Sequence, residues 1–470
     1  MKGKAKAKAN WLDPSTAADN EILPKYLKWA WTSRGLSLAL NVILIMQLTY
    51  YCTDMLGMPA LGVGTLLLAS KLFDGVTDLL IGFVIDRTHT RFGKARPYEI
   101  SIVFVWLLTV LLFSVPSSMG LGAKYVYIFI LYTLINSVFA TALNGGDAVY
   151  LARAVRSEKN RVSIMSFNGA IIMLFSIVIS IVMPQLIAGI GATKEGWTVI
   201  AVVFAVPLVV IGMLRFVFVK EVAIPDTARE AKKSGAEQSL PLRTSLRCLV
   251  QNKYIFLISG MTLCVQLISN IGSSVNTYYF KYIVGDIGLA SLVSMSSMIT
   301  PLVMVFFPVL SRKLGMVRLL KVGMVIGVIG YALRIAGGTN LATLTVGSLL
   351  SGVAILPITM MISIYLIDCM DYGEWKTGIR IEGILASVNS FSSKLGSGIA
   401  SSLVGIIMGM AGYDGALEVQ SAAANVSIVA LFNYLPMVLV VVTLILAFLY
   451  RLDQQMPQIK ADLEAKRARG

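Results

Sequence analysis

Residues 59–85 read PALGVGTLLLASKLFDGVTDLLIGFVI, an apolar stretch that carries two aspartates near its middle. A run of about 20 apolar residues is long enough to cross a bilayer as a helix. Because Asp74 and Asp78 lie four positions apart, their carboxylates share one helix face. Each carboxylate costs at least ~2.5 kcal/mol at a bilayer centre, so this face needs a cation, a proton or a basic partner. The stretch therefore predicts a membrane helix that binds a small positive ion.

Apolar runs of similar length recur along the whole chain of 470 residues, which is 56% hydrophobic and only 14% charged. This composition excludes an ordinary soluble protein and predicts an all-α membrane protein. We expect about twelve transmembrane helices, near residues 30–53, 59–85, 98–118, 124–151, 163–190, 197–219, 254–284, 289–311, 317–337, 341–368, 380–410 and 424–450.

The net charge of +15 reflects topology rather than a nucleic-acid partner. Basic residues crowd every second connection between the apolar runs, which by the positive-inside rule places both termini and the central loop in the cytoplasm. We expect an integral plasma membrane protein, of the bacterial inner membrane, that contacts lipid and is monomeric. Its predicted parts are a tail (1–29), a first six-helix bundle (30–219), a central loop (220–253), a second six-helix bundle (254–450) and a tail (451–470).

Oxygen ligands gather around the acidic pair and on the fourth predicted span. Thr77 adds a hydroxyl beside the carboxylates, and hard cations such as Na⁺ prefer oxygen. Lys71 lies one turn before Asp74. Lys71 could instead form a structural ion pair with one of the two aspartates, which would leave the other carboxylate unpaired. On the fourth span, Thr141, Asn144 and Asp147 repeat every three residues and share a face; Asp147 could alternatively be a membrane-end anchor.

Lys394 interrupts the eleventh predicted span near its middle. A buried ammonium needs an acidic partner, and the acids of the second and fourth spans are the candidates. The single histidine, His89, and four unpaired-looking cysteines offer no metal cluster and no nucleophile–base arrangement. We therefore expect no enzyme activity and no cofactor beyond a coupling cation, Na⁺ (or Li⁺) or H⁺.

Two sequence blocks resemble the glycoside–pentoside–hexuronide:cation symporters, whose members include the melibiose permease. The first block runs from Phe73-Asp-Gly-Val-Thr-Asp78 to Arg91-Phe-Gly-Lys-Ala-Arg-Pro97, and the second reads Asp371-Tyr-Gly-Glu-Trp-Lys-Thr-Gly378. The resemblance covers nearly the whole chain. It implies the major-facilitator fold, with two six-helix bundles around a central cavity.

By this resemblance, Asp74, Asp78, Thr77, Thr141 and Asn144 would hold the coupling cation, with Lys71 and Lys394 as charge partners. By the same resemblance Asn144 would also touch the substrate, and we expect Asp147, Lys394 and Asn168 to complete the substrate site. A cytoplasmic gate is expected at Asp86, Arg87, Arg161, Arg312, Asp368, Asp371 and Arg380.

The chain departs from the family pattern on the substrate side. Helix one reads Ser37-Leu38 where sugar-transporting members carry a charged ligand, Ala148 replaces an aromatic platform, and Gly169 replaces an arginine. We expect cation-coupled symport of a sugar or glycoside by alternating access. Transport of a lysolipid or another amphipathic substrate is the alternative, and a ligand-binding receptor without flux is a further one. The choice between Na⁺ and H⁺ stays open.

Overall fold

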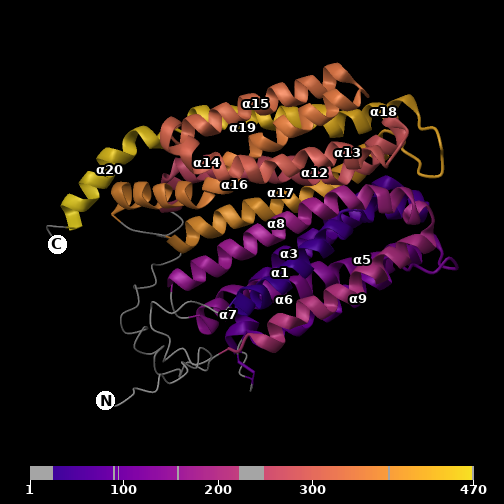
Figure 1. Ribbon diagram of the computed structural model, residues 1–470, viewed down its shortest axis with the longest axis horizontal. Coiled ribbons are helices and arrows are strands. Elements are labelled where there is room, and N and C mark those ends of the chain that lie inside the picture. The colour runs from indigo at the N-terminus through magenta and orange to yellow at the C-terminus, as the bar shows by residue number, and fades with distance from the viewer. Residues whose placement is uncertain are drawn as a thin grey trace, which may run out of the picture. The chain divides into compact units, whose positions relative to one another are not determined.

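The computed structural model describes the backbone of residues 25–87, 90, 92–93, 95–155, 158–221, 248–378 and 382–467. Within these ranges the regular secondary structure is helical, and one isolated bridge joins Thr90 and Gly93. The expected all-α class is therefore confirmed (Figure 1). The contacts divide the chain into unit 1 (Met1–Met58 and Leu66–Gly235) and unit 2 (Pro59–Thr65 and Ala236–Gly470).

The helices assigned to unit 1 follow the apolar runs of the first half of the chain. In order they are α1 (Lys25–Ile45), α2 (Leu48–Tyr50), a π-helical turn (Tyr51–Met55), α3 (Ala60–Arg87, whose first residues group with unit 2), a 3-10 turn (Arg96–Ile100), α4 (Ser101–Leu112), α5 (Leu121–Thr133), a second π-helical turn (Leu134–Ala140), α6 (Thr141–Gly145), α7 (Asp147–Ala154), α8 (Glu158–Ala188), a 3-10 turn (Ile190–Ala192) and α9 (Lys194–Phe218).

Helix α1 is the centre of unit 1, because it packs against α8, α9 and α4. Polar side chains join these helices across the apolar core. Trp106 Nε1 of α4 donates to Ser37 Oγ at 2.8 Å, and Ser37 Oγ donates to the Leu208 carbonyl of α9 at 2.7 Å. Hydrogen bonds between helices are valuable in a bilayer, where a buried polar group has no water to turn to. They fix how each helix is rotated about its axis.

The helices of unit 2 follow the second half of the chain. In order they are α12 (Lys253–Tyr278), a π-helical turn (Tyr279–Val284), α13 (Leu289–Met295), a 3-10 turn (Ser296–Ile299), α14 (Thr300–Leu314), α15 (Met316–Gly337), α16 (Leu341–Thr377), α17 (Glu382–Met410), α18 (Ala422–Val429), a π-helical turn (Ala430–Tyr434), α19 (Leu435–Leu449) and α20 (Leu452–Arg467).

Close helix packing in unit 2 depends on small residues. At Gly330 of α15 a Cβ atom would lie 2.8 Å from the Gly347 carbonyl oxygen of α16. Glycine lets two backbones approach this closely, which increases van der Waals contact where the hydrophobic effect does not drive helices together. The C-terminal helix α20 then lies on α16. Its buried side chains are Leu452, Met456, Ile459 and Leu463.

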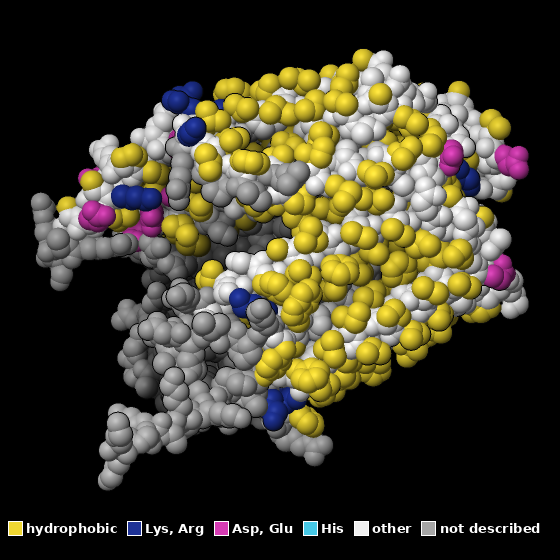
Figure 2. All heavy atoms as spheres, viewed as in Figure 1, with side chains coloured by type: hydrophobic (Ala, Val, Ile, Leu, Met, Phe, Trp, Pro, Cys, Tyr) yellow, Lys and Arg dark blue, Asp and Glu magenta, His cyan; other side chains and the backbone are white. Residues whose placement is uncertain are grey.

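By length and apolar composition, nine helical segments in the described part of the chain could each cross a membrane. Every one of the twelve expected spans is helical over most of its described residues. Three of the twelve expected spans are not among these nine segments. They are α3, which carries charged residues in its middle, α4, which is short and follows a 3-10 turn, and α13–α14, which a 3-10 turn interrupts. Figure 2 shows hydrophobic side chains spread over the visible faces of the helices, with charged side chains near helix ends.

Candidate functional site

The acidic face of α3 is partly neutralised by its own lysine. Lys71 Nζ lies 2.9 Å from Asp74 Oδ2, and both side chains are 23% exposed. The ammonium also lies 5.6 Å from the centre of the Tyr132 ring. The other carboxylate oxygen, Asp74 Oδ1, is buried and has no hydrogen-bond partner among the described residues. An unpaired buried carboxylate oxygen is costly, and a bound cation is one way to satisfy it.

Two hydroxyl groups expected near the ion are held by backbone carbonyls. Thr77 Oγ1 donates to the carbonyls of Phe73 and Asp74 at 3.1 and 3.2 Å, and Thr141 Oγ1 donates to the Asn136 carbonyl at 3.1 Å. A hydroxyl that donates its proton to the backbone keeps its oxygen lone pairs for a cation. The side chain of Asp78 lies outside the described part. In the described part, no group of three His, Cys, Asp or Glu side chains could hold a metal ion.

Unit 1 contains a buried charge network that joins four helical segments. Arg34 of α1 contacts Asp147 Oδ1 of α7 at 2.5 Å and lies 3.7 Å from Glu99 Oε2. Arg215 of α9 contacts the same Asp147 oxygen and lies 3.6 Å from Glu99 Oε1. The side chains of Arg34, Glu99 and Arg215 are 3%, 3% and 1% exposed, whereas that of Asp147 is 34% exposed. Two positive and two negative charges balance, as a buried ion network requires.

Aromatic rings complete the surroundings of Arg215. Its guanidinium carbon lies 3.6 Å from the centre of the Trp31 ring and 4.8 Å from that of Tyr150. The negative ring faces attract a desolvated guanidinium. The network therefore combines ion pairs, hydrogen bonds and ring contacts in one buried cluster.

The residues predicted to bind substrate on the first bundle meet at one place on α1. Arg34 Nη1 donates to Asn144 Oδ1 at 3.2 Å, and Asn144 is exposed. At the next position, Gly35 lets α8 approach, because a Cβ there would lie 2.9 Å from Asn168 Oδ1. Asn144, Asp147 and Asn168 thus surround residues 34–35 of α1. Lys394 lies on α17 in unit 2, where it is exposed, and its pairing with the acids of the first bundle stays a prediction.

The structure places three of the predicted gate residues. Asp368 Oδ1 of α16 lies 3.7 Å from Lys460 Nζ of α20, so its observed partner is a lysine of the C-terminal helix. Asp371 lies one turn further along α16, and Arg161 Nε donates to the Val155 carbonyl at 2.6 Å. The expected contacts between gate residues stay predictions. The other four predicted gate residues have side chains outside the described part of the structure: Asp86, Arg87, Arg312 and Arg380.

Sequence reasoning missed Arg34, Glu99 and Arg215. Each lies within a predicted span, and an ionisable residue inside an apolar run is a signal of function or of pairing. That signal was present in the sequence. What the sequence lacked was the rotation of each helix, which decides whether such a side chain points into the bundle.

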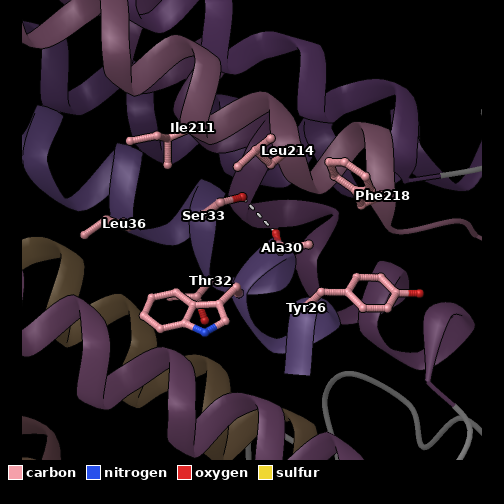
Figure 3. A pocket seen from close by; sticks show the side chains of 9 residues that line it. Tyr26, Ala30, Thr32, Ser33, Leu36, Ile211, Leu214 and Phe218 are labelled. Carbon is pink, nitrogen blue, oxygen red and sulfur yellow. Dashed lines mark hydrogen bonds between the residues drawn. The ribbon is translucent and has the colours of Figure 1, made fainter. Parts of the chain in front are cut away.

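A separate cavity of about 680 Å³ lies between α1 and α9 (Figure 3). The hydroxyl of Ser33, one of its few polar groups, donates to the Ala30 carbonyl of its own helix at 2.8 Å. The lining is otherwise mainly apolar, which suits an acyl chain better than a sugar. It consists of Tyr26, Trp29, Ala30, Thr32, Ser33, Leu36, Ile211, Leu214 and Phe218.

Known proteins resemble this chain over nearly its whole length. The isoprimeverose transporter of Lactiplantibacillus pentosus is 29% identical over 97% of this chain and 94% of its own length. The glucuronide carrier protein homolog of Escherichia coli (strain K12) is 25% identical over 89% of this chain and 91% of its own length. The crystal structure of a mutant of the nucleoside transporter NupG matches with a TM-score of 0.59 at 17% identity, covering 89% of this chain and 99% of that one.

The structural match supports the major-facilitator fold, and the sequence relatives confirm the resemblance to sugar symporters. A family model described as MFS/sugar transport protein matches residues 36–454. This range contains the acidic face of α3, the Glu99, Asp147 and Arg215 members of the buried charge network, and all the expected spans except the first residues of the first one. The chain is therefore a multi-pass membrane transporter that belongs to the MFS/sugar transport protein family.

Proposed function

We propose that the protein is a secondary active transporter that carries a sugar or glycoside together with one small cation, Na⁺ or H⁺, by alternating access. The observation that carries this proposal is the buried Asp74 oxygen, which has no partner in the described part of the structure although Lys71 holds the other oxygen. A cation beside Asp74, Asp78, Thr77 and Thr141 would satisfy it. Asn144, one turn of helix after Thr141, would link the cation to the substrate face.

Coupling follows from the free energy of the loaded and empty states. If the cation favours substrate binding, the substrate must favour cation binding by the same factor, typically ~1–3 kcal/mol. An empty site leaves carboxylates uncompensated within the bilayer, and this cost opposes the change between the outward-facing and inward-facing states. A membrane potential adds ~2.3 kcal/mol per charge per 100 mV. In a bacterial inner membrane, with both termini of the protein in the cytoplasm, this potential pulls the cation inward and so drives uptake of the substrate.

The experiment is uptake of radiolabelled isoprimeverose by the purified protein in liposomes. One set receives an inward Na⁺ gradient at fixed pH, and the other receives an inward proton gradient without Na⁺. Accumulation against the isoprimeverose gradient in either set supports symport and identifies the cation. Uptake that equilibrates without accumulation under both gradients would refute cation coupling, and binding without any flux would favour a receptor.

The apolar cavity between α1 and α9 favours one alternative, transport of an amphipathic substrate such as a lysolipid. Its lining offers few polar groups beyond Thr32, Ser33 and the hydroxyl of Tyr26. The same liposomes test this with a fluorescent lysophospholipid. Cation-driven movement of this probe, with no uptake from a panel of glycosides that includes isoprimeverose, would replace the sugar proposal.

A further inference from the structure

The buried charge network does more than balance charge, because it fixes which polar atoms α6 and α7 present to the exterior of the bundle. Arg34 donates to Asn144 Oδ1 at 3.2 Å. A guanidinium has only donors, so this bond holds the amide with its oxygen toward Arg34. The amide nitrogen of Asn144, a donor, is therefore turned to the exposed side.

Asp147 is oriented by the same arginine. Arg34 and Arg215 both contact its Oδ1 atom, so Oδ2 is the oxygen left for the exposed side of this 34% exposed carboxylate. Asn144 and Asp147 are three positions apart along neighbouring helical segments. Residues with this spacing lie about 5–6 Å apart at their Cβ atoms on a helix surface. The face thus presents a hydrogen-bond donor next to a charged acceptor.

We propose that Arg34 is a positioning residue for the substrate, and that the face it organises binds the hydroxyl groups of an uncharged sugar. A hydroxyl group can donate to Asp147 Oδ2 and accept from Asn144 Nδ2 at the same time. A carboxylate, sulfonate or phosphate has no proton for Asp147 and meets its negative charge. The two guanidinium groups that could attract an anion are turned inward, at 3% and 1% exposure.

This inference rests on the proposed function but selects among substrates within it. The curated relatives include both an isoprimeverose transporter and a glucuronide carrier protein homolog. The pattern of donor and acceptor at α6 and α7 places this chain with carriers of uncharged glycosides. Arg34 acts through Asn144 and Asp147, and we do not assign it a contact with the substrate.

The test measures binding to the full-length protein in detergent by calorimetry, with isoprimeverose and a methyl glucuronide as probes. We expect the wild type to bind isoprimeverose more tightly than the glucuronide. Arg34→Lys keeps the charge but loses the fork that reaches both side chains, and Asn144→Ala removes the outward donor. Each should weaken isoprimeverose binding about tenfold, since a site built for a hydroxyl loses affinity when its partner atoms are misplaced.

A double-mutant cycle separates positioning from a merely structural role. If Arg34 acts partly through Asn144, the loss of affinity in the variant with both changes should be smaller than the product of the two single losses, because the two effects are not independent. Arg215→Lys is the matched control: Arg215 contacts the same Asp147 oxygen but not Asn144 in the structure. The loss of isoprimeverose affinity in Arg215→Lys/Asn144→Ala should equal the product of the two single losses.

Asn144→Asp keeps the test decisive if Arg34→Lys fails to fold. The exposed position tolerates the change, the new carboxylate still accepts from Arg34, and the outward atom becomes an acceptor in place of a donor. We expect a folded protein, with an unchanged size-exclusion profile, that has lost isoprimeverose binding. Unchanged binding in this variant, or in both single variants, would overturn the proposal, as would multiplying effects in the double variant.

The choice of probe separates this inference from the proposed function. Tighter binding of the glucuronide by the wild type would overturn the inference and leave sugar transport standing. If the wild type binds neither these probes nor any glycoside of a broader panel, the proposed function fails, and the assignment of Arg34 fails with it.

Discussion

Replacing Arg215 by leucine tests whether the charge network of unit 1 is a balanced unit. Arg215 contacts Asp147 Oδ1, lies 3.6 Å from Glu99 Oε1 and is 1% exposed. Its removal leaves two carboxylates with Arg34 as the remaining guanidinium. Breaking a buried ion pair by removing one partner costs about 3–5 kcal/mol, because an uncompensated charge stays behind. The lost contact with the Trp31 ring, 3.6 Å from the guanidinium carbon, acts in the same direction.

We therefore expect Arg215→Leu to lower the free energy of unfolding by about 3–5 kcal/mol. Denaturant titration of the protein in detergent micelles, followed by tryptophan fluorescence, measures this. Arg96→Leu is a control, because the side-chain hydrogen bonds described for Arg96 go to the neutral Phe216 carbonyl rather than to a carboxylate. Loss of neutral-acceptor hydrogen bonds should cost less, about 1–3 kcal/mol.

The double variant Arg215→Leu/Glu99→Leu makes the reasoning refutable. It removes one positive and one negative charge, and replacing a whole buried pair by apolar residues is often neutral. We expect it to recover most of the stability that Arg215→Leu loses. A single variant within about 1 kcal/mol of the wild type, or a double variant as unstable as the single one, would show that charge balance does not explain the network.

Three other predictions concern separate parts of the chain. Asp74→Asn should abolish cation-driven accumulation in liposomes while size-exclusion profiles stay unchanged; surviving accumulation would remove Asp74 from the site. Ile459→Asn should detach α20 from α16 and make the buried thiol of Cys369 reactive toward maleimide. Mass spectrometry of a variant that lacks the other cysteines measures this, and an unreactive thiol would argue against the packing of α20 on α16. Arg334→Met should lower the free energy of unfolding by about 2 kcal/mol, because its guanidinium carbon lies 4.0 Å from the Phe432 ring centre and it donates to the Phe432 carbonyl; denaturant titration with no change would contradict this.

The fold could be predicted from the sequence because each apolar run carries its own evidence. Length and hydropathy predicted the helices, and two specific blocks predicted the family that the comparisons confirm. The predicted tail at residues 451–470 is the helix α20 over Leu452–Arg467, where Leu452, Met456, Ile459 and Leu463 repeat at helical spacing. This pattern predicts an amphipathic helix, and the structure shows those side chains buried.

The partners within the candidate site could not be predicted in the same way. The spacing of Lys71 and Asp74 along one helix predicted their contact, because residues three apart are neighbours on a helix surface. Asp147 depends on Arg34 of α1 and Arg215 of α9, which are both more than 60 positions away in the chain. Hydropathy gives the extent of a helix but not its rotation or its neighbours. The pairing of Asp147 with Arg34 and Arg215 therefore needed the structure.

The charge on the acidic face of α3 predicts how many cations accompany each substrate molecule. Glu99 and Asp147 have arginine partners, whereas Asp74 pairs with Lys71 of its own helix. By sequence, the ionisable residues of this face are Lys71, Asp74 and Asp78. With all three ionised, this face carries one net negative charge, which one Na⁺ or one H⁺ cancels. Lys71 as a structural partner and Asp74 as an ion ligand are thus compatible, since each takes a different carboxylate oxygen.

We expect one cation to accompany each substrate molecule, measured in liposomes as the membrane potential at which net substrate flux reverses under known gradients. In Lys71→Gln the face carries two negative charges, so the apparent cation affinity should rise about tenfold, a change of ~1.4 kcal/mol. The neutral glutamine keeps a similar length and serves the packing against Tyr132. A reversal potential that requires two cations in the wild type, or a cation affinity that falls in Lys71→Gln, would mean that Lys71 does not set the charge of the site.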